Sequence, residues 1–248
     1  MRTGILITAR LKSVRLPRKA IKPINGRPML EYLVERLRAV KCADEMILCT
    51  SPFPEDDPLV EIAEKENIKF FRGDPDDVLK RLKDAAEKYE IDRILNVTAD
   101  NPLIDPTYLD RLAKFLTDNK HDFAATEGLP WGTFGWAVTY PAIVRACEIK
   151  AEQDTEVWGG YFTETGLFSC GTLKADEEHF WPDLRLTVDT PEDFRLVSTI
   201  IERLSKPMGK LQLSEIIEFC RKNPDLVTLN SEIQQKKPKP IRLKSTND

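Results

Sequence analysis

Short apolar runs alternate with longer amphipathic segments along the first half of the chain. The apolar runs predict buried strands at 4–9, 45–50, 68–72, 93–99 and 122–126. Between them, apolar positions at helical spacing predict helices over 27–40, 57–66, 74–89 and 106–117. Asp74 is the expected cap of the third helix, and Pro106 begins the fourth. This alternation predicts parallel βαβ units and therefore a three-layer α/β/α sandwich with a mostly parallel, Rossmann-like sheet.

The pattern changes between residues 127 and 183, where short apolar pieces mix with Gly, Trp and Pro. One helix at about 141–152, flanked by strands at 134–140 and 167–173, predicts a small, partly antiparallel lobe beside the sheet. A last strand is then expected at 184–188, before helices at 191–204 and 213–222. We interpret residues 1–232 as one domain and 233–248, rich in Lys and Pro, as a flexible tail.

Composition narrows the class of protein. With 248 residues, 31% of them charged, and a net charge of −4, the chain is typical of a globular protein and offers no overall basic footprint for nucleic acid. No apolar run approaches the roughly 20 residues of a membrane span, and the N-terminal pattern is not that of a signal peptide. Five cysteines without metal-ligand spacing favour reduced thiols, so we expect a cytoplasmic protein without a zinc site or disulfide frame.

Charged side chains follow three of the predicted strands at their carboxyl ends, where open parallel sheets bind ligands. The first strand is followed by a basic loop, consisting of Arg10, Lys12, Arg15, Arg18 and Lys19. Asp100 and Asn101 follow the fourth strand, and Asp189 follows the late one. Arginine and lysine neutralise phosphate oxygens, and Mg²⁺ binds to one or two carboxylates plus phosphate. The arrangement therefore indicates a site for a polyphosphate with a divalent cation.

Each cluster also has a purely structural interpretation. Asp189 or Thr190 is a suitable N-cap for the helix that Pro191 begins, and for that segment alone capping is the favoured interpretation. The Asp100–Pro102 stretch is also compatible with a plain turn, and the basic loop with a solvated surface strip. The co-location of the three clusters in one fold carries the prediction of a site.

Four stretches together resemble the cytidylyltransferase family: "ITARLKSVRLPRKAIKPINGRPMLEYLVERL", "FRGDPDDVLKRL", "TADNPLIDP" and "LRLTVDTPEDFRLV". That family includes the acylneuraminate and 3-deoxy-manno-octulosonate cytidylyltransferases, and the nearest pattern is that of the spore coat polysaccharide biosynthesis protein F group. The resemblance covers roughly residues 3–200 and is weakest between 127 and 183. It implies a fold of the nucleotide-diphospho-sugar transferase type.

The resemblance also implies roles for individual residues. Arg10 and Lys19 would hold the triphosphate of CTP, Arg72 would help place the base, and Asp100 and Asp189 would bind Mg²⁺. Further nucleotide contacts are implied at Ala9, Leu11, Arg15 and Thr98. The implied reaction transfers CMP from CTP to the hydroxyl of an acidic 2-keto-3-deoxy sugar, giving a CMP-sugar and pyrophosphate for surface glycans. Asp189 is one candidate for the base that takes the acceptor's proton. A glycosyltransferase, another sugar nucleotidyltransferase on this fold, or a non-catalytic nucleotide-binding homologue remain alternatives.

Aromatic residues gather in the region of weakest resemblance, among them Trp131, Trp136, Trp158 and Tyr161. A core or dimer contact is the favoured interpretation, and stacking of an acceptor sugar on Trp131 and Tyr161 is the alternative. Relatives pair through this region, so the resemblance implies a homodimer.

The chain also departs from the family pattern. Lys12 and Arg18 stand where relatives commonly have glycine, and a positive φ there would strain both residues. Thr187 replaces a second acid that sialic acid-type relatives carry, which indicates a single aspartate at this position or a different acceptor.

Overall fold

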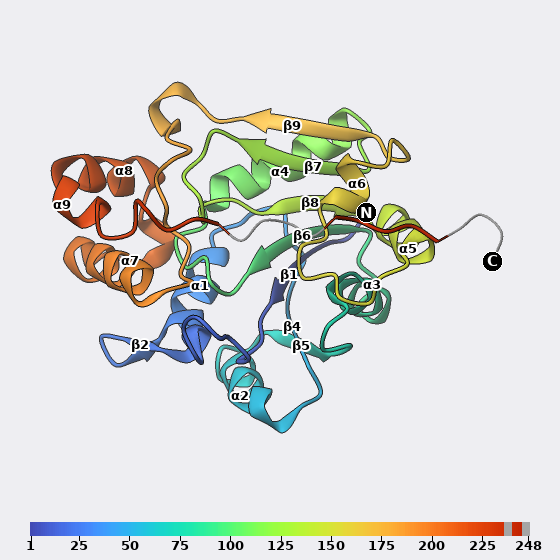
Figure 1. The fold of residues 1–248 in the computed structure, drawn as a ribbon, viewed down its shortest axis with the longest axis horizontal. Coiled ribbons are helices and arrows are strands. Elements are labelled where there is room, and N and C mark those ends of the chain that lie inside the picture. Colours follow the sequence, from blue (N-terminus) through green and yellow to red (C-terminus); the bar gives the residue numbers. More distant parts are fainter. Residues whose placement is uncertain (236–239, 245–248) are drawn as a thin grey trace.

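The computed structural model describes residues 1–235 and 240–244. A seven-stranded sheet runs through the molecule in the order β5-β4-β1-β6-β8-β7-β9 (Figure 1). Its strands are β1 (Thr3–Thr8), β4 (Glu45–Thr50), β5 (Lys69–Arg72), β6 (Arg93–Thr98), β7 (Phe123–Glu127), β8 (Trp136–Thr139) and β9 (Cys170–Lys174). β1, β4, β5 and β6 pair in parallel, whereas β8 is antiparallel to both β6 and β7.

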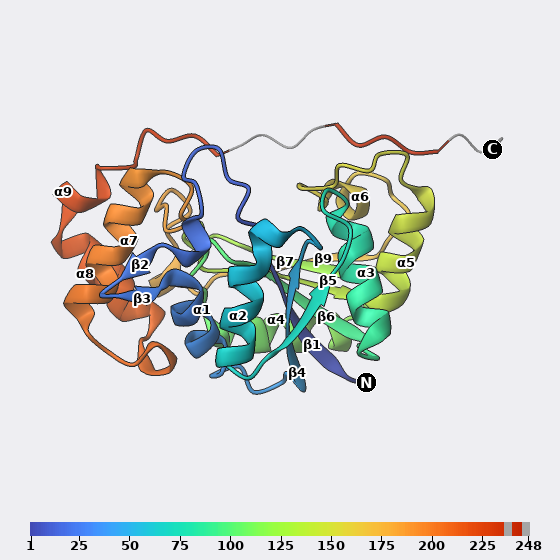
Figure 2. The same ribbon diagram turned by 90° about the horizontal axis from the view of Figure 1, so that it is seen from below.

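Helices cover both faces of this sheet (Figure 2). One face packs against α1 (Met29–Leu37), α2 (Asp57–Lys65) and α4 (Pro106–Asp118). The other packs against α3 (Val78–Lys88), α5 (Tyr140–Ile149) and α6 (Gly160–Thr163). Because both faces are covered, three successive residues of β1 are all buried: Ile5 and Ile7 belong to the first core, and Leu6 to the second. The predicted α/β/α sandwich with a mostly parallel sheet is confirmed.

A further group of helices lies at one end of the sheet, drawn orange to red in Figure 1. It consists of α7 (Pro191–Leu204), α8 (Leu213–Lys222) and α9 (Pro224–Val227), and its own core includes Leu184, Leu186 and Val188. A two-stranded hairpin of β2 (Pro23–Ile24) and β3 (Arg27–Pro28) lies between the basic loop and α1. Single 3-10 turns complete the fold: η1 (Lys19–Ile21), η2 (Pro54–Asp56), η3 (Glu177–His179) and η4 (Met208–Lys210).

The region 127–183 does not form a lobe beside the sheet. Its strands β8 and β9 are members of the central sheet, with β8 between β6 and β7 and β9 at the edge. The antiparallel pairing was correctly predicted. The placement was wrong because the alternation of apolar residues does not reveal which strand a segment pairs with.

The segment 184–188 is extended but is not a strand of the sheet. It makes one isolated parallel bridge, between Arg185 and Trp131, with backbone hydrogen bonds from Trp131 to Leu184 and from Leu186 back to Trp131. Gly132 allows this close approach, since its φ is +98° and a Cβ there would lie 2.4 Å from the Thr187 nitrogen. The apolar run "LRLTV" is therefore buried against α7 and α8 without a sheet partner.

Two smaller predictions also need correction. The cap of α3 is Asp77, which accepts a hydrogen bond from the Lys80 nitrogen, whereas Asp74 accepts from the Asp76 and Asp77 nitrogens in the loop before it. Residues 240–244 of the predicted flexible tail pack onto α5 and α6: Leu243 pairs with Lys150, and Ile241 contacts the core of that face. Residues 236–239 and 245–248 lie outside the described part. None of the helices in the described part has the length and hydropathy of a membrane span.

Candidate active site

The loops after β1 and β6 leave the sheet side by side. Thr8 and Thr98, the last residues of these strands, pair directly in the parallel ladder. The chain reaches β6 only after passing through β4 and β5 on the other side of β1, so this is the switch point of the sheet. Ligands of open α/β sheets bind at such a point, beyond the carboxyl ends of the strands. The basic loop and Asp100 therefore face each other there.

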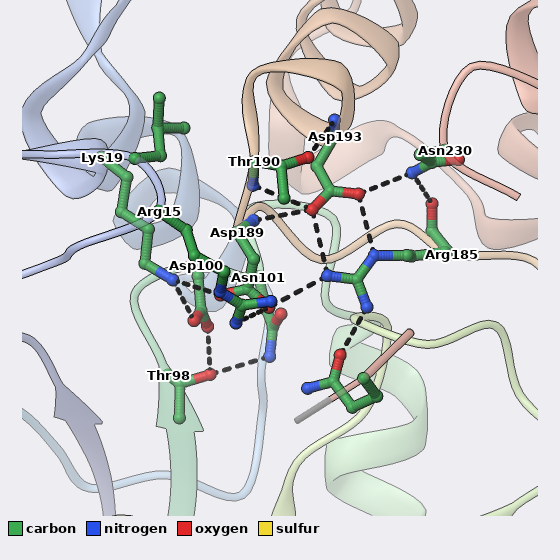
Figure 3. A network of polar contacts seen from close by, with 12 residues as sticks. Arg15, Lys19, Thr98, Asp100, Asn101, Arg185, Asp189, Thr190, Asp193 and Asn230 are labelled. Atoms are coloured by element: carbon green, nitrogen blue, oxygen red, sulfur yellow. Dashed lines mark hydrogen bonds and ion pairs between the residues drawn. The ribbon is translucent and has the colours of Figure 1, made fainter. Parts of the chain in front are cut away.

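Lys19 joins the two predicted aspartates (Figure 3). Its ammonium donates to Asp100 Oδ2 at 2.7 Å and to Asp189 Oδ1 at 2.7 Å. The two acceptors come from the end of β6 and from the segment before α7, which are distant in sequence. The structure thus brings together three of the four predicted catalytic residues.

Local backbone conformation places Lys19. The preceding residue, Arg18, has φ +56° and ψ +28°, a left-handed conformation that turns the chain into η1. The expected strain therefore exists at Arg18, where an L-residue costs about 1–2 kcal/mol relative to glycine. Lys12 has no positive φ and carries no such strain.

Asp100 is held by its own strand end. Thr98 donates from its hydroxyl to Asp100 Oδ1 at 2.5 Å, and the Asn101 amide donates to the same hydroxyl at 2.9 Å. The Asn101 side-chain oxygen is buried and has no hydrogen-bond partner among the described residues. It is an acceptor oxygen beside a carboxylate, and it remains available for a cation or a donor group.

Asp189 is not the cap of α7. Thr190 is the N-cap, accepting from the Asp193 nitrogen, while the Asp193 carboxylate accepts from the Thr190 nitrogen in a capping box. The carboxylate of Asp189 therefore points toward the basic loop, where Arg15 approaches its Oδ2 at 3.0 Å. The capping interpretation favoured for this segment alone was wrong for Asp189, because the neighbouring threonine performs that role.

A buried network supports Asp189 from behind. Arg185 donates through Nη2 to Asp189 Oδ2 and to Asp193 Oδ2, both at 3.0 Å, and through Nε to Asp193 Oδ1 at 2.8 Å. Asp193 is fully buried and also accepts from the Asn230 amide at 2.8 Å. Gln235 accepts a further hydrogen bond from Arg185. The Asp193 carboxylate thus holds Arg185 in place, and Arg185 in turn holds the carboxylate of Asp189.

Charge pairing sets the ionisation of these groups. Burial alone would raise the pKa of Asp189, but Lys19, Arg15 and Arg185 outweigh it and lower the pKa below the ordinary value. Burial likewise would lower the pKa of Lys19, but Asp100 and Asp189 outweigh it and raise the pKa. Both groups are therefore charged at neutral pH.

The remaining predicted nucleotide residues lie on the β4–β5 side of the basic loop. Arg10 pairs with Asp76 at 2.9 Å and also donates to the Pro75 carbonyl. Arg72, the last residue of β5, pairs with Asp57 at 2.5 Å. The structure does not show Arg10 in contact with the Lys19 group.

The backbone of the loop is fixed on the same side. Ala9 donates to the Cys49 carbonyl at 3.2 Å, and Leu11 donates to the buried carboxylate of Asp56 at 2.7 Å. The start of the basic loop is therefore tied to the end of β4.

The two aromatic candidates lie in different surroundings. Trp131 is 38% exposed, and its backbone is paired with the segment that leads to Asp189. Tyr161 is 3% exposed and belongs to the core with Trp158 and Phe162. The core interpretation is thus confirmed for Tyr161 and Trp158, and sugar stacking on Tyr161 was a wrong prediction, since the ring is not accessible.

The side-chain oxygens of Asp100, Asp189 and Asn101 are suitable ligands for a divalent cation that is bound together with phosphate. Within 1–235 and 240–244, no group of three or more His, Cys, Asp or Glu residues could bind a metal by itself. Asp100 and Asp189 nevertheless present one oxygen each to the same ammonium, and the free Asn101 oxygen belongs to the residue after Asp100. Two carboxylates plus phosphate oxygens and water are the usual ligands of Mg²⁺.

Four residues that support this site were not predicted from the sequence: Arg185, Asp193, Asn230 and Asp56. Asn101 was predicted to follow the fourth strand, but no role was predicted for it. A signal for Arg185 existed: a lone arginine inside an apolar run is expected to be buried only if it is paired. Asp189 and Asp193, four and eight residues later, were the available partners. Asn230 and Asp56 gave no comparable signal, because they reach the network only through tertiary packing.

Comparison with known proteins gives matches over nearly the whole chain. Relatives include an uncharacterized protein of Methanocaldococcus jannaschii, 31% identical over 93% of this chain and 95% of the relative. The spore coat polysaccharide biosynthesis protein SpsF of Bacillus subtilis is 29% identical over 90% of this chain and 95% of its own. The 3-deoxy-manno-octulosonate cytidylyltransferase of Brucella suis is 35% identical, over 50% of each chain.

A solved structure and a family model also match this chain. The structure of a cytidylyltransferase from Leptospira borgpetersenii superposes with a TM-score of 0.84 at 28% identity, covering 96% of this chain and 100% of the other. The model of the cytidylyltransferase family matches residues 4–232, which include the basic loop, Asp100 and Asp189. The chain therefore belongs to the cytidylyltransferase family.

Proposed function

We propose that this protein is a Mg²⁺-dependent enzyme that transfers CMP from CTP to the hydroxyl of an acidic, 2-keto-3-deoxy sugar. The observation that carries the proposal is the convergence of Lys19 on Asp100 and Asp189 beside a basic loop, in a member of the cytidylyltransferase family. The names of two relatives support the sugar class: one acts on 3-deoxy-manno-octulosonate, and the other serves polysaccharide biosynthesis. The product would be a CMP-sugar for surface glycans.

We expect the nucleotide to span both sides of the basic loop. Lys19 and Arg15 would bind the phosphates, since their present partners are carboxylates that phosphate oxygens can replace. Arg72 lies on the β4–β5 side, where it would help place the base, and Arg10, which pairs with Asp76 on that side, would exchange this carboxylate for the triphosphate. Asp100 and Asp189 would hold Mg²⁺, which when bound neutralises charge on the phosphates.

In the reaction, the acceptor hydroxyl oxygen forms a bond to the α-phosphorus of CTP. The bond from that phosphorus to the oxygen bridging to the β-phosphate breaks, and pyrophosphate leaves. Lys19 stabilises the negative charge that develops on the leaving group. Asp189 is a poor candidate for the base, because it would hold Mg²⁺ and keep the contact with Arg185, and both cations make a carboxylate a weak proton acceptor. The hydroxyl proton is released to water.

Three further features belong to the proposal. Trp131 would border the acceptor, because its backbone bridge to Arg185 places it next to the network that supports Asp189. The region 127–183 would form a homodimer contact. A CTP-using enzyme with five free thiols would work in the cytoplasm.

The test is pyrophosphate release from each of the four nucleoside triphosphates, against a panel of 2-keto-3-deoxy sugar acids and neutral sugars. We expect release with CTP and one acid, dependent on Mg²⁺, and a loss of about 10²–10³-fold in kcat for both D100A and D189A. Thermal melting of each variant controls for folding. Undiminished turnover in D100A or D189A contradicts the proposal. Pyrophosphate release with neutral sugars but with none of the sugar acids also contradicts it.

A further inference from the structure

One ammonium occupies the space between the two carboxylates proposed to bind a metal. Lys19 Nζ lies 2.7 Å from an oxygen of Asp100 and 2.7 Å from an oxygen of Asp189. We propose that in the free protein Lys19 takes the place of the divalent cation, so that cation and ammonium compete for the same two oxygens. This inference rests on the proposed function for the identity of the metal site.

The other oxygens of the pair are already occupied. Asp100 Oδ1 accepts from Thr98, and Asp189 Oδ2 is contacted by both Arg15 and Arg185. The oxygens that Lys19 contacts are therefore the ones that Asp100 and Asp189 would offer to a divalent cation. The Lys19 ammonium is largely buried, with 15% of the side chain exposed, so its attraction to them is weakly screened by solvent.

Phosphate gives Lys19 an alternative partner. Lys19 follows the turn at Arg18 on the basic loop, and Lys12 and Arg18 on the same loop have no ion-pair partner among the described residues. A triphosphate attracted there would bind Lys19 and Arg15 in place of the aspartates. The departure of Lys19 would free one oxygen of Asp100 and one of Asp189 for a divalent cation, whose ligands commonly include phosphate oxygens.

Arg185 explains why Asp189 keeps its position after this exchange. The Asp189 carboxylate has three cationic neighbours, and two of them, Arg15 and Lys19, belong to the basic loop. Arg185 is buried and fixed by two contacts to Asp193, so it cannot follow the phosphates. Metal and nucleotide therefore bind cooperatively, and the metal alone binds weakly.

The experiment measures Mn²⁺ binding in the absence of nucleotide, by electron paramagnetic resonance of the free ion, with calorimetry as a second method. The proteins are the wild type, K19M, D100N and the double variant K19M/D100N. K12M is the matched control, because it removes one positive charge from the same loop and Lys12 has no ion-pair partner in the described part of the chain. Thermal melting confirms that each variant is folded.

We expect K19M to bind one Mn²⁺ at least about tenfold more tightly than the wild type, and K12M to change the affinity less than about twofold. The double variant should lose the gain, because the amide of Asn has lost the negative charge and one of the two carboxylate oxygens of Asp100. Equal affinity in K19M and wild type, an equal gain in K12M, or a gain retained in K19M/D100N would each overturn the inference. Its failure is distinguishable from that of the proposed function, because wild-type pyrophosphate release from CTP is measured independently of Mn²⁺ binding.

Discussion

Asp100 and Asp189 contact the same ammonium, but the structure supports them by different means. Asp100 follows β6, which pairs with β1 on one side and β8 on the other, so its position derives from backbone ladders. Asp189 follows a segment that is held by one isolated bridge and by one backbone hydrogen bond, from the Val188 nitrogen to the Asp100 carbonyl at 2.8 Å. The position of the Asp189 carboxylate derives from two side chains, Arg185 and Asp193, and from the close approach of Gly132.

The two means of support predict how sensitive the positions of Asp100 and Asp189 are to substitution of other residues. Backbone hydrogen bonds do not depend on side-chain identity, so no single side chain outside β6 is critical for Asp100. A position fixed by a buried ion pair depends on each member, since removal of one leaves the other charged and unpaired. The Asp189 side should therefore be the more sensitive to substitution.

The largest effect is expected from removal of Arg185. R185M leaves the buried carboxylate of Asp193 without its cation, and should lower the free energy of unfolding by about 3–5 kcal/mol. The measurement is urea unfolding. The matched control is R111M, which breaks an exposed pair with Asp176 and should cost less than about 1 kcal/mol. If R185M and R111M have the same free energy of unfolding, the Arg185 side chain does not support Asp189.

A smaller effect is expected at Gly132. In G132A the new methyl group meets the Thr187 backbone, and the positive φ adds strain, so we expect a loss of about 2–4 kcal/mol in the free energy of unfolding. Gly26 is the control, because it has φ +77° but no atom within 4 Å of an added Cβ. G26A should cost only about 1 kcal/mol. An equal cost at both sites would show that the close approach to residues 186–187 does not matter.

The smallest expected effect is the pH dependence of the contribution that ionised Asp189 makes to the free energy of unfolding. Its pKa is lowered in the folded protein, so the folded state binds this proton less readily than the unfolded state. Its contribution to stability is therefore complete above the ordinary pKa of 3.8 and is lost as the pH falls through the lower folded value. The stability difference between wild type and D189N should stay constant from pH 7 to 5 and shrink below 3.8. Urea unfolding across this range is the measurement, and a difference that shrinks above pH 5 contradicts the assignment.

Elements with a local signal were predicted well. β4 is an apolar run with polar neighbours at both ends, and its observed bounds are those predicted. α7 begins where Thr190, Pro191 and Asp193 form a capping box, and it too has the predicted bounds. In both cases the residues that decide the structure lie within a few positions of each other.

Elements that depend on distant partners were predicted poorly. "LRLTV" has the composition of a strand, but β8 already occupies the place beside β6, so the segment packs on α7 and α8 instead. Asp77 rather than Asp74 caps α3 because it is also held by Lys150 and Thr155. Neither partner is visible from the local pattern.

The sequence alone determined that the basic loop and Asp100 follow the ends of β1 and β6, because the periodicity of apolar residues that defines those ends is local. It did not determine that Asp189 follows a segment outside the sheet. Only the tertiary structure decided which of these charges meet. Lys19 contacts one aspartate 81 positions away and another 170 positions away, while Arg10, in the same loop, pairs with Asp76. The physical reason is that an ion pair forms according to the packing of the sheet and helices around it, and this packing is a property of the whole chain.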